Sequence, residues 1–445
     1  MPCLTYGQRL VVATKKDSFE LGSIEFSKAL HSQIMVAAMD SVWSALQQDE
    51  SATLSSSRRQ LLACWSLDPS ITFLNHGSFG ACPLPVLAAQ QHWRNRMERQ
   101  PLQFFGRDLE ALLDDARTEL AVFVGAEADD LAFVPNATTA INTVLKSLSF
   151  APGDELLTTN QEYNACRNAL NYVAERYDLK VVVATVPFPL EEPQQVIDAI
   201  VGCVSDKTRL VLLDHVVSQT GLVFPLAALV QALTKRGVET LVDGAHAPGM
   251  LPLNLQAIGA TYYTGNLHKW VSAPKGAAFL YVQRDRQPAI RPLTISHGAN
   301  ATRTDRSRFR VEFDWTGTDD PTAYLCVPDA IRFMGSLLPG GWDELMATNH
   351  ALAIAARHVL CETLQIPPPC PDGMLGAMAV VPLPDGKPME LQDALLERYQ
   401  IEVPIVPFPT ASSRLVRVSA QFYNHLEQYE YLARAIAELL QEEAS

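Results

Sequence analysis

The sequence predicts an α/β fold, in which a mainly parallel sheet covered by helices is followed by a smaller C-terminal α+β domain. The first observation is that short apolar runs alternate with amphipathic stretches, such as Asp108–Phe123 and Leu226–Lys235, from about residue 60 to residue 330. A repeated strand–helix–strand order favours parallel pairing through right-handed crossovers. The runs predicted to be strands are Ile71–Leu74, Leu131–Val134, Glu155–Thr159, Val181–Val186, Arg209–Leu213, Glu239–Val242 and Ala278–Val282.

The second observation is a change of pattern from about Gly341, where the long alternation stops. Three helices and two strands are predicted there, at Ala351–Leu364 (helix), Met378–Pro382 (strand), Glu390–Tyr399 (helix), Arg414–Ser419 (strand) and from Leu426 onward (helix). A chain of 445 residues is long enough for about three folding units. We predict a large domain over residues 61–335 and a small α+β domain over residues 336–445.

The first 60 residues are predicted to be a helical arm followed by a linker. Apolar residues recur at every fourth position from Phe26 to Leu46, which places them on one face of a helix. The polar stretch Ser51–Arg59 is typical of a linker. We expect the arm to dock on the body of the protein or on a partner subunit.

The composition argues against several classes of protein. Hydrophobic residues make up 48% of the chain, which is enough for a large core and excludes a disordered scaffold. The net charge of −14 disfavours binding to nucleic acids or anionic membranes, and no apolar run is long enough to predict a transmembrane helix. The eight cysteines form no CxxC pair, so we expect neither a metal site nor a disulfide framework. Because no secretory signal is apparent, we expect a cytoplasmic protein.

Chemically useful side chains follow several predicted strands. Asp243 and His246 come directly after one strand, and Asp214 ends another. In an open parallel sheet, ligands bind beyond the carboxyl ends of the strands. The segment Asn136–Thr139 follows a third strand and opens a helix, where free backbone N–H groups favour a phosphate, although ordinary helix caps share this composition.

A lysine completes this set. Lys269 comes 26 residues after Asp243 and is followed by Trp270 and a Pro-Lys-Gly turn. An apolar setting lowers the pKa of a lysine and favours its neutral, nucleophilic amine. A nucleophilic lysine, a phosphate-binding turn and an acid that keeps a heteroaromatic nitrogen protonated are together what pyridoxal phosphate (PLP) requires. The sequence contains no GxGxxG after a strand and no P-loop, which disfavours dinucleotides and nucleoside triphosphates.

Seven motifs occur in a characteristic order along the chain. They are LNHGSFGACP (74–83), PNATTAINTVL (135–145), DHVVSQTGLVFP (214–225), VDGAHAPG (242–249), YYTGNLHKW (262–270), WTGTDDP (315–321) and RVSAQFYN (417–424). By these motifs the sequence resembles the class V aminotransferases, which are fold-type I PLP enzymes, and in particular their isopenicillin N epimerase-like branch. The resemblance covers roughly residues 70–440 and implies a seven-stranded sheet in the large domain.

The resemblance implies roles for the residues around the cofactor ring. Lys269 forms the Schiff base with PLP and moves protons at the substrate carbon, while Asp243 pairs with the pyridine nitrogen. His246 lies against the ring or near its phenolic oxygen, and Ser218 lies near the same oxygen. Tyr163 stands where relatives place a ring, commonly a histidine, that stacks over the cofactor.

The resemblance also implies a phosphate site and a dimer. Ala137 and Thr138 form the phosphate turn, helped by His268 and Asn266. Thr318 is similar to a phosphate ligand donated by the other subunit, which implies a homodimer with shared active sites.

The implied substrate is a small, amino-acid-like molecule. Arg417 resembles the arginine that binds the α-carboxylate, and such a bidentate pair fixes the orientation of the bonds at Cα. Asn75 and His76 are expected in the same pocket. Arg107 is a weaker candidate for substrate selection, and a plain role on a helix surface is an equal alternative.

The reaction itself is left open. The first expectation is an epimerase or racemase that acts through a carbanion at Cα, with Lys269 serving one face and Tyr163 or His246 the other. The second is a C–S lyase that eliminates a β-sulfur group from a cysteine conjugate or sulfoxide, which needs only one base. An aminotransferase and a non-catalytic PLP-binding protein are further alternatives. A persulfide-forming desulfurase is not expected, because residues 403–413, which precede the strand of Arg417, contain no cysteine.

Overall fold

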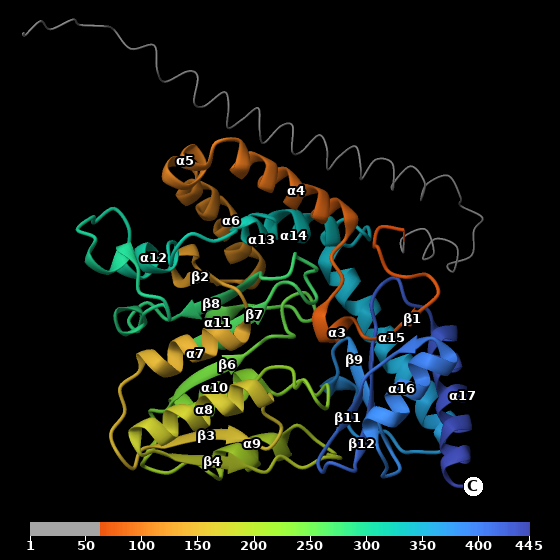
Figure 1. The fold of residues 1–445 in the computed structure, drawn as a ribbon. Coiled ribbons are helices and arrows are strands. Elements are labelled where there is room, and N and C mark those ends of the chain that lie inside the picture. Colours follow the sequence, from red (N-terminus) through yellow and green to blue (C-terminus); the bar gives the residue numbers. More distant parts are fainter. Residues whose placement is uncertain (1–62) are drawn as a thin grey trace, which may run out of the picture. The chain divides into compact units, whose positions relative to one another are not determined.

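The computed structural model describes residues 63–445, and the predicted arm lies outside the described residues. Its main feature is a seven-stranded sheet with the order β2-β8-β7-β6-β5-β3-β4 (Figure 1). β8 is antiparallel to both of its neighbours and the other pairs are parallel. The predicted α/β fold with a mainly parallel seven-stranded sheet is therefore confirmed. The strands are β2 Leu131–Val134, β3 Glu155–Thr159, β4 Lys180–Ala184, β5 Thr208–Asp214, β6 Glu239–Asp243, β7 Tyr262–Asn266 and β8 Ala278–Val282.

Two strands differ from the prediction. β1 (Thr72–Phe73) falls within a predicted strand, but it pairs with β10 (Ile401–Glu402) in a separate two-stranded sheet instead of joining the main one. An apolar run predicts a strand without predicting its partner, which here lies near the other end of the chain. β7 is missing from the predicted strands because its sequence, YYTGN, ends in Thr, Gly and Asn. All five of its residues are nevertheless buried, since β6 and β8 pair with it on either side.

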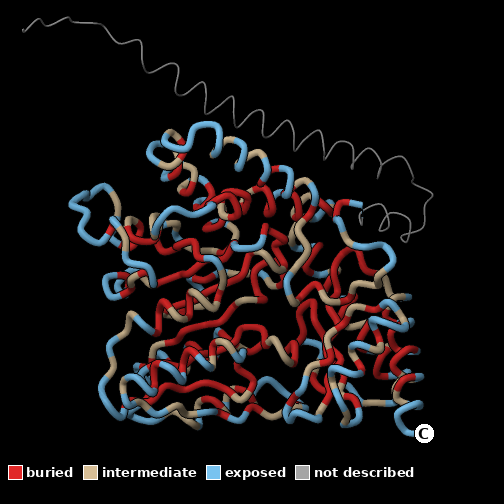
Figure 2. Tube along the Cα trace, viewed as in Figure 1, coloured by how far each residue is buried: buried red, intermediate tan, exposed pale blue. Residues whose placement is uncertain are grey.

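Helices cover the sheet. α7 (Ala137–Ser147) and α8 (Asn164–Tyr177) pack against each other and against the strands (Figure 1). Most strands of the sheet are buried, except that the edge strand β4 is partly exposed, and the other exposed residues lie mainly on the outer turns of helices and in loops (Figure 2). The remaining helices before residue 336 are α3 His76–Phe79, α4 Leu84–Arg99, α5 Pro101–Gln103, α6 Leu109–Val124, α9 Gln194–Val201, α10 Leu226–Thr234, α11 Leu255–Ile258, α12 Arg308–Phe313, α13 Thr322–Leu325 and α14 Val327–Gly335.

The C-terminal elements form a second, antiparallel sheet with the order β11-β12-β9 (Figure 1). Its predicted strands and helices are present, although the first helix starts ten residues earlier than predicted and β11 and β10 were not expected. The elements are α15 Gly341–Leu364, β9 Met378–Leu383, α16 Pro388–Tyr399, β11 Ile405–Pro407, β12 Arg414–Ser419 and α17 Leu426–Glu443. The backbone N–H of Ser419 donates to the carbonyl of Leu74 at 2.9 Å, so the end of β12 lies against the segment that leads into α3.

Within residues 63–445, no helix combines the length and the apolar character that a membrane span requires.

Candidate active site

Lys269 lies in the turn between β7 and β8, against a histidine that follows β6. Its Nζ is 2.9 Å from Nε2 of His246, and the indole N–H of Trp270 donates to Nδ1 of the same imidazole at 3.4 Å. Burial lowers the pKa of His246 well below its usual value and lowers the pKa of Lys269 to about 8. Because Nδ1 of His246 accepts a hydrogen bond from Trp270, the neutral imidazole carries its hydrogen on Nε2. This Nε2–H group can donate a hydrogen bond to the lysine amine only when that amine is neutral. The contact therefore favours a nucleophilic amine.

Asp243 ends β6 and is only 4% exposed. Its Oδ1 accepts from the backbone N–H of Ala245 at 2.8 Å, and its Oδ2 accepts from the thiol of Cys166 at 3.2 Å. Burial raises the pKa of Asp243, while these two donors and the charge of Lys269 oppose the rise. A buried carboxylate in such a setting gains from a cationic partner, such as a protonated ring nitrogen.

The first turn of α7 is the predicted phosphate site. The side chain of Asn136 caps the helix by accepting from the backbone N–H of Thr139 at 2.8 Å. The N–H of Ala137 donates to Oδ1 of Asn266 at 2.9 Å, so the structure joins two of the predicted phosphate ligands to each other. Thr138 lies between these two bonded positions, at the positive end of the helix dipole.

His268 is placed beside Lys269 but is bonded to the protein backbone. Its Nδ1 lies 3.1 Å from the carbonyl oxygen of Ala277. Burial lowers its pKa to about 4, so the ring is neutral in this environment. Because Nδ1–H donates to the carbonyl, Nε2 of the neutral ring is an acceptor. His268 can donate a hydrogen bond to a phosphate oxygen only if the negative charge of the phosphate raises its pKa enough to protonate Nε2.

Arg417 reaches the site from β12 and is 5% exposed. Its Nη2 donates to Oγ of Ser78 at 2.8 Å, and its Nη1 donates to the backbone carbonyl of Ser218 and lies 3.3 Å from its hydroxyl. Its Nε is buried and has no partner among the described residues. Burial lowers the pKa of Arg417 to about 10, which still leaves it charged at neutral pH. A charged guanidinium with an unpartnered buried N–H fits a carboxylate.

Asn75 and His76 lie at the start of α3, and both already have protein partners. Nδ1 of His76 bonds the hydroxyl of Tyr423 at 2.8 Å and Nε2 lies 3.1 Å from the carbonyl of Lys269, while the amide of Asn75 donates to Glu402 at 3.2 Å. Burial lowers the pKa of His76 to about 3. His76 thus contacts the backbone carbonyl of Lys269.

The end of α3 touches the same backbone so closely that only glycine fits. Gly80 has φ +69°, and a Cβ at this position would lie 2.2 Å from the carbonyl oxygen of His268. A side chain at Gly80 would therefore displace the turn that carries Lys269.

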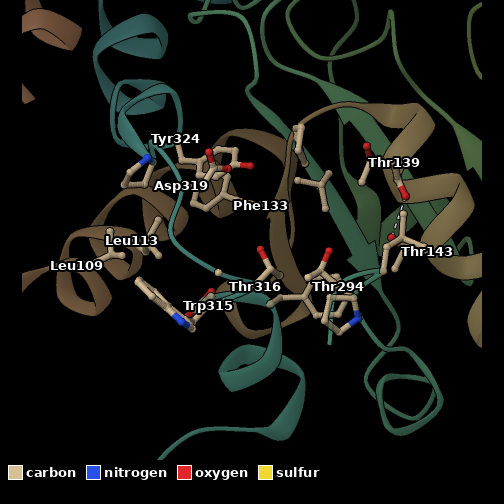
Figure 3. Close-up of a pocket in the computed structure, with 18 of the residues that line it drawn as sticks. Leu109, Leu113, Phe133, Thr139, Thr143, Thr294, Trp315, Thr316, Asp319 and Tyr324 are labelled. Atoms are coloured by element: carbon tan, nitrogen blue, oxygen red, sulfur yellow. Dashed lines mark hydrogen bonds between the residues drawn. The ribbon is translucent and has the colours of Figure 1, made fainter. Parts of the chain in front are cut away.

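Three predicted residues are exposed and make none of these contacts. Tyr163 precedes the first residue of α8, Thr318 lies in the loop between α12 and α13, and Arg107 donates to Gln103 at 3.1 Å in a π-helical turn. The loop of Thr318 borders a cavity of about 270 Å³ that also includes Thr139 of α7 (Figure 3). Apolar side chains, among them Phe133, provide much of its lining.

The structure adds four residues that were given no role from the sequence: Ser78, Glu162, Cys166 and Asp214. Ser78 bonds Arg417, and Glu162 and Cys166 lie beside Asp243. Asp214 was recognised as a polar residue at a strand end, and its Oδ2 is buried without a partner among the described residues. Glu162 directly precedes Tyr163, so the position after β3 was the available signal for it. Nothing local indicates Cys166, which lies inside a helix.

Comparisons with known proteins place this site in a family. The family model for class V aminotransferases matches residues 81–405. Isopenicillin N epimerase from Amycolatopsis lactamdurans is 38% identical over 389 residues, which cover 84% of this chain and 96% of that protein. A probable chloroplastic L-cysteine desulfhydrase from Arabidopsis thaliana is 32% identical over 403 residues, which cover 84% of each chain.

Solved structures share the fold at lower identity. A cysteine desulfurase from Thermococcus onnurineus superimposes with a TM-score of 0.71 at 18% identity and covers 86% of this chain and 98% of that one. The cystine C–S lyase C-DES, in complex with cysteine persulfide, gives a TM-score of 0.70 at 22% identity over 83% of this chain and 98% of that one. The family model covers most of the chain, and both relatives named above exceed 30% identity over most of their own length. The chain therefore belongs to the class V aminotransferase family.

Proposed function

We propose that this protein is an epimerase or racemase that inverts the configuration at Cα of an amino-acid substrate. Membership of the class V family makes it a PLP-dependent enzyme. The observation that carries the proposal is the half-buried Lys269, whose amine is held by His246 in the site that also contains the buried carboxylate-binding candidate Arg417. When bound, PLP supplies an electron sink that stabilises negative charge at Cα.

The chain's own residues then have separate tasks. Lys269 binds the cofactor and carries the proton on one face of the substrate. Asp243 would hold the ring nitrogen protonated, and Ser218 and His246 would bind the phenolic oxygen. Arg417 binds the α-carboxylate, and its partners Ser78 and Ser218 keep the guanidinium in place. The phosphate is assigned to Thr138 and to the neighbouring Ala137, Asn266 and His268.

Inversion needs a second group on the opposite face, and we assign it to Tyr163. His246 contacts the lysine amine itself, so it serves the same side as Lys269. The phenol of Tyr163 is 45% exposed at the start of α8 and lies near enough to Arg417 to oppose the effect of burial on the arginine pKa. This electrostatic influence of Tyr163 on the carboxylate-binding candidate supports the choice of its hydroxyl for the second face.

We further propose a homodimer with shared active sites. Thr318 is exposed in a loop that borders the cavity of Figure 3, next to the first turn of α7. A phosphate ligand that reaches across to a partner subunit needs such an exposed position. We propose a cytoplasmic enzyme that acts on a small amino-acid-like molecule.

A C–S lyase is the second candidate. It is favoured by the 32% identity to a probable L-cysteine desulfhydrase and by the presence of one clear base, which suffices for elimination. A persulfide-forming desulfurase has less support. Cys370 is buried and bonded through its carbonyl to Arg357 at 2.7 Å, and burial raises the pKa of its thiol to about 11.

The reaction is tested by incubating the holo-protein in D₂O with a panel of amino acids and cysteine conjugates. An epimerase is expected to place deuterium at Cα, to leave the carbon skeleton intact and to form both enantiomers, as NMR and chiral chromatography would show. Release of pyruvate and a thiol would instead establish the lyase.

Tyr163→Phe separates the two reactions further. If Tyr163 serves the second face, this variant should still exchange the Cα proton of one enantiomer but form the other about 10²- to 10⁴-fold more slowly, the usual contribution of a general acid or base. Equal losses of exchange and inversion would contradict the assignment. A lyase would retain its turnover in this variant.

The capture of PLP should depend on pH through Lys269. Burial lowers the pKa of this amine from 10.5 to about 8, and only the neutral amine attacks the aldehyde. We therefore predict that the rate of PLP capture by the cofactor-free protein rises with pH, with a midpoint near 8, as stopped-flow absorbance would record. A midpoint near 10, the value of an ordinary lysine, would show that the amine is not in the buried environment.

A further inference from the structure

Behind Asp243, three buried groups from different elements converge. Glu162 lies in the loop before α8, Cys166 lies in the first turn of α8, and Asp243 ends β6. One oxygen or sulfur atom from each residue lies within 4.8 Å of the others. All three residues are at most 5% exposed. The proposed role of Asp243 uses only one member of this cluster.

The contacts of Asp243 fix the plane of its carboxylate. Sγ of Cys166 lies 3.2 Å from Oδ2, and the backbone N–H of Ala245 donates to Oδ1 at 2.8 Å. Burial raises the pKa of the Cys166 thiol far above its usual value, and the charge of Asp243 adds to the rise. The sulfur therefore keeps its hydrogen and donates it to the carboxylate, so each oxygen of Asp243 has one donor.

Glu162 competes with Asp243 for a proton. Its Oε2 accepts from the hydroxyl of Thr158 at 3.0 Å, and its Oε1 accepts from the backbone N–H of Tyr163 at 3.1 Å. Burial raises the pKa of Glu162 to about 8, and the charge of Asp243 contributes to the rise. Two buried carboxylates this close do not both ionise without a large cost. The hydrogen bonds that each carboxylate accepts therefore bias which of the two carries the negative charge.

We propose that Cys166 is a positioning residue for the cofactor, whose thiol keeps Asp243 as the anion that pairs with the pyridine nitrogen. A thiol is a weak donor, so it lowers the proton affinity of Asp243 only slightly and leaves Oδ2 able to accept a second hydrogen bond. Without the thiol, the proton shared by Asp243 and the ring nitrogen moves toward the carboxylate. This inference rests on the proposed role of Asp243.

The test reads the protonation state of the ring nitrogen directly. Holo-protein is reconstituted with PLP that carries ¹⁵N in the ring, and the ¹⁵N chemical shift is compared among variants. We expect Cys166→Ala to move the shift toward that of an unprotonated pyridine and to weaken PLP binding by about three- to tenfold, the range for one hydrogen bond. Cys166→Ser, which keeps a donor at this position, should retain the original shift.

A matched control removes another buried thiol. Cys326 is fully buried next to α14 and outside the cluster, so Cys326→Ala creates a similar vacancy and should leave the ¹⁵N shift unchanged. If Cys166→Ala also leaves the shift unchanged, the inference is overturned. It is likewise overturned if Cys166→Ser shifts as far as Cys166→Ala, because packing and not donation would then be the cause.

Asp243→Asn in the same measurement separates this inference from the proposed function. If Asp243→Asn keeps the ring nitrogen protonated, the assigned role of Asp243 fails, and the role of Cys166 fails with it. If Asp243→Asn changes the shift and Cys166→Ala does not, only the role of Cys166 is lost.

Discussion

Lys269→Ala is expected to abolish covalent capture of PLP and to lower kcat by at least ~10⁴-fold, the upper range for a group that acts as acid or base. The amine is held by His246 and is buried enough for its pKa to fall to about 8. Alanine removes both the nucleophile and the proton carrier at once. Borohydride reduction followed by mass spectrometry of the peptides measures the first effect, and turnover of an accepted substrate measures the second.

A neighbouring lysine provides the control. Lys275 is exposed, and its Nζ donates to the carbonyl of Gly80 at 2.8 Å. Lys275→Ala should keep the reducible adduct at the original level. If Lys269→Ala still formed that adduct, the assignment of the cofactor-binding lysine would be wrong.

Arg417→Ala is expected to raise KM for substrates with an α-carboxylate by about 10- to 150-fold, equivalent to 1.5–3 kcal/mol for a hydrogen bond to a charged group. The guanidinium is buried, and its Nε has no partner among the described residues. Alanine leaves no cation there to bind the carboxylate. Arg417→Lys should restore only part of the affinity, because an ammonium lacks the planar fork that binds a carboxylate through two bonds.

Arg414 is the control that shows whether the rise in KM comes from the loss of a substrate-binding group or from the loss of any buried arginine on β12. It lies on β12 three residues before Arg417, is 1% exposed and bonds Glu443 through two contacts of 2.8 Å. Arg414→Ala should lower the free energy of unfolding, measured by urea denaturation, and leave KM unchanged. An unchanged KM in Arg417→Ala would remove Arg417 from the substrate site.

The fold could be predicted from the sequence because strands and helices leave patterns in short stretches of residues. Apolar runs separated by amphipathic helices predict a parallel sheet, and the confirmed strands β3 and β12 match their predicted ranges. Pairing between distant segments leaves no local pattern. The partner of β1 and the short strand β11 were therefore not predictable, and β7 was obscured by the polar residues that its buried position allows.

The same distinction applies to the site. Asp243 and His246 follow a predicted strand, so their presence at one edge of the sheet could be predicted. Lys269 follows β7, which was not among the predicted strands, and its place in the site was expected from its spacing after Asp243 and from the family resemblance. The structure brings the three together. Their individual roles stay predictions. Cys166 was not predictable as a partner of Asp243, because its contact depends on how α8 packs against β6. The bond between Ala137 and Asn266 was also not predictable. Each residue alone is a plausible phosphate ligand, and nothing in the sequence indicates that the two bond each other.

The bond between Ser419 and Leu74 has a thermodynamic consequence. It ties β12, which carries Arg417, to the segment that supports Lys269. A substrate held by its carboxylate at Arg417 and by its amine at a cofactor that Asp243 and the first turn of α7 would hold spans the main sheet and the C-terminal sheet. Such a ligand acts as a reversible cross-link between the two sheets. Because it binds only when both parts are folded and in contact, its binding free energy adds to the free energy needed to separate or unfold them. The catalytic complex is then more resistant to heat and proteolysis than the protein alone.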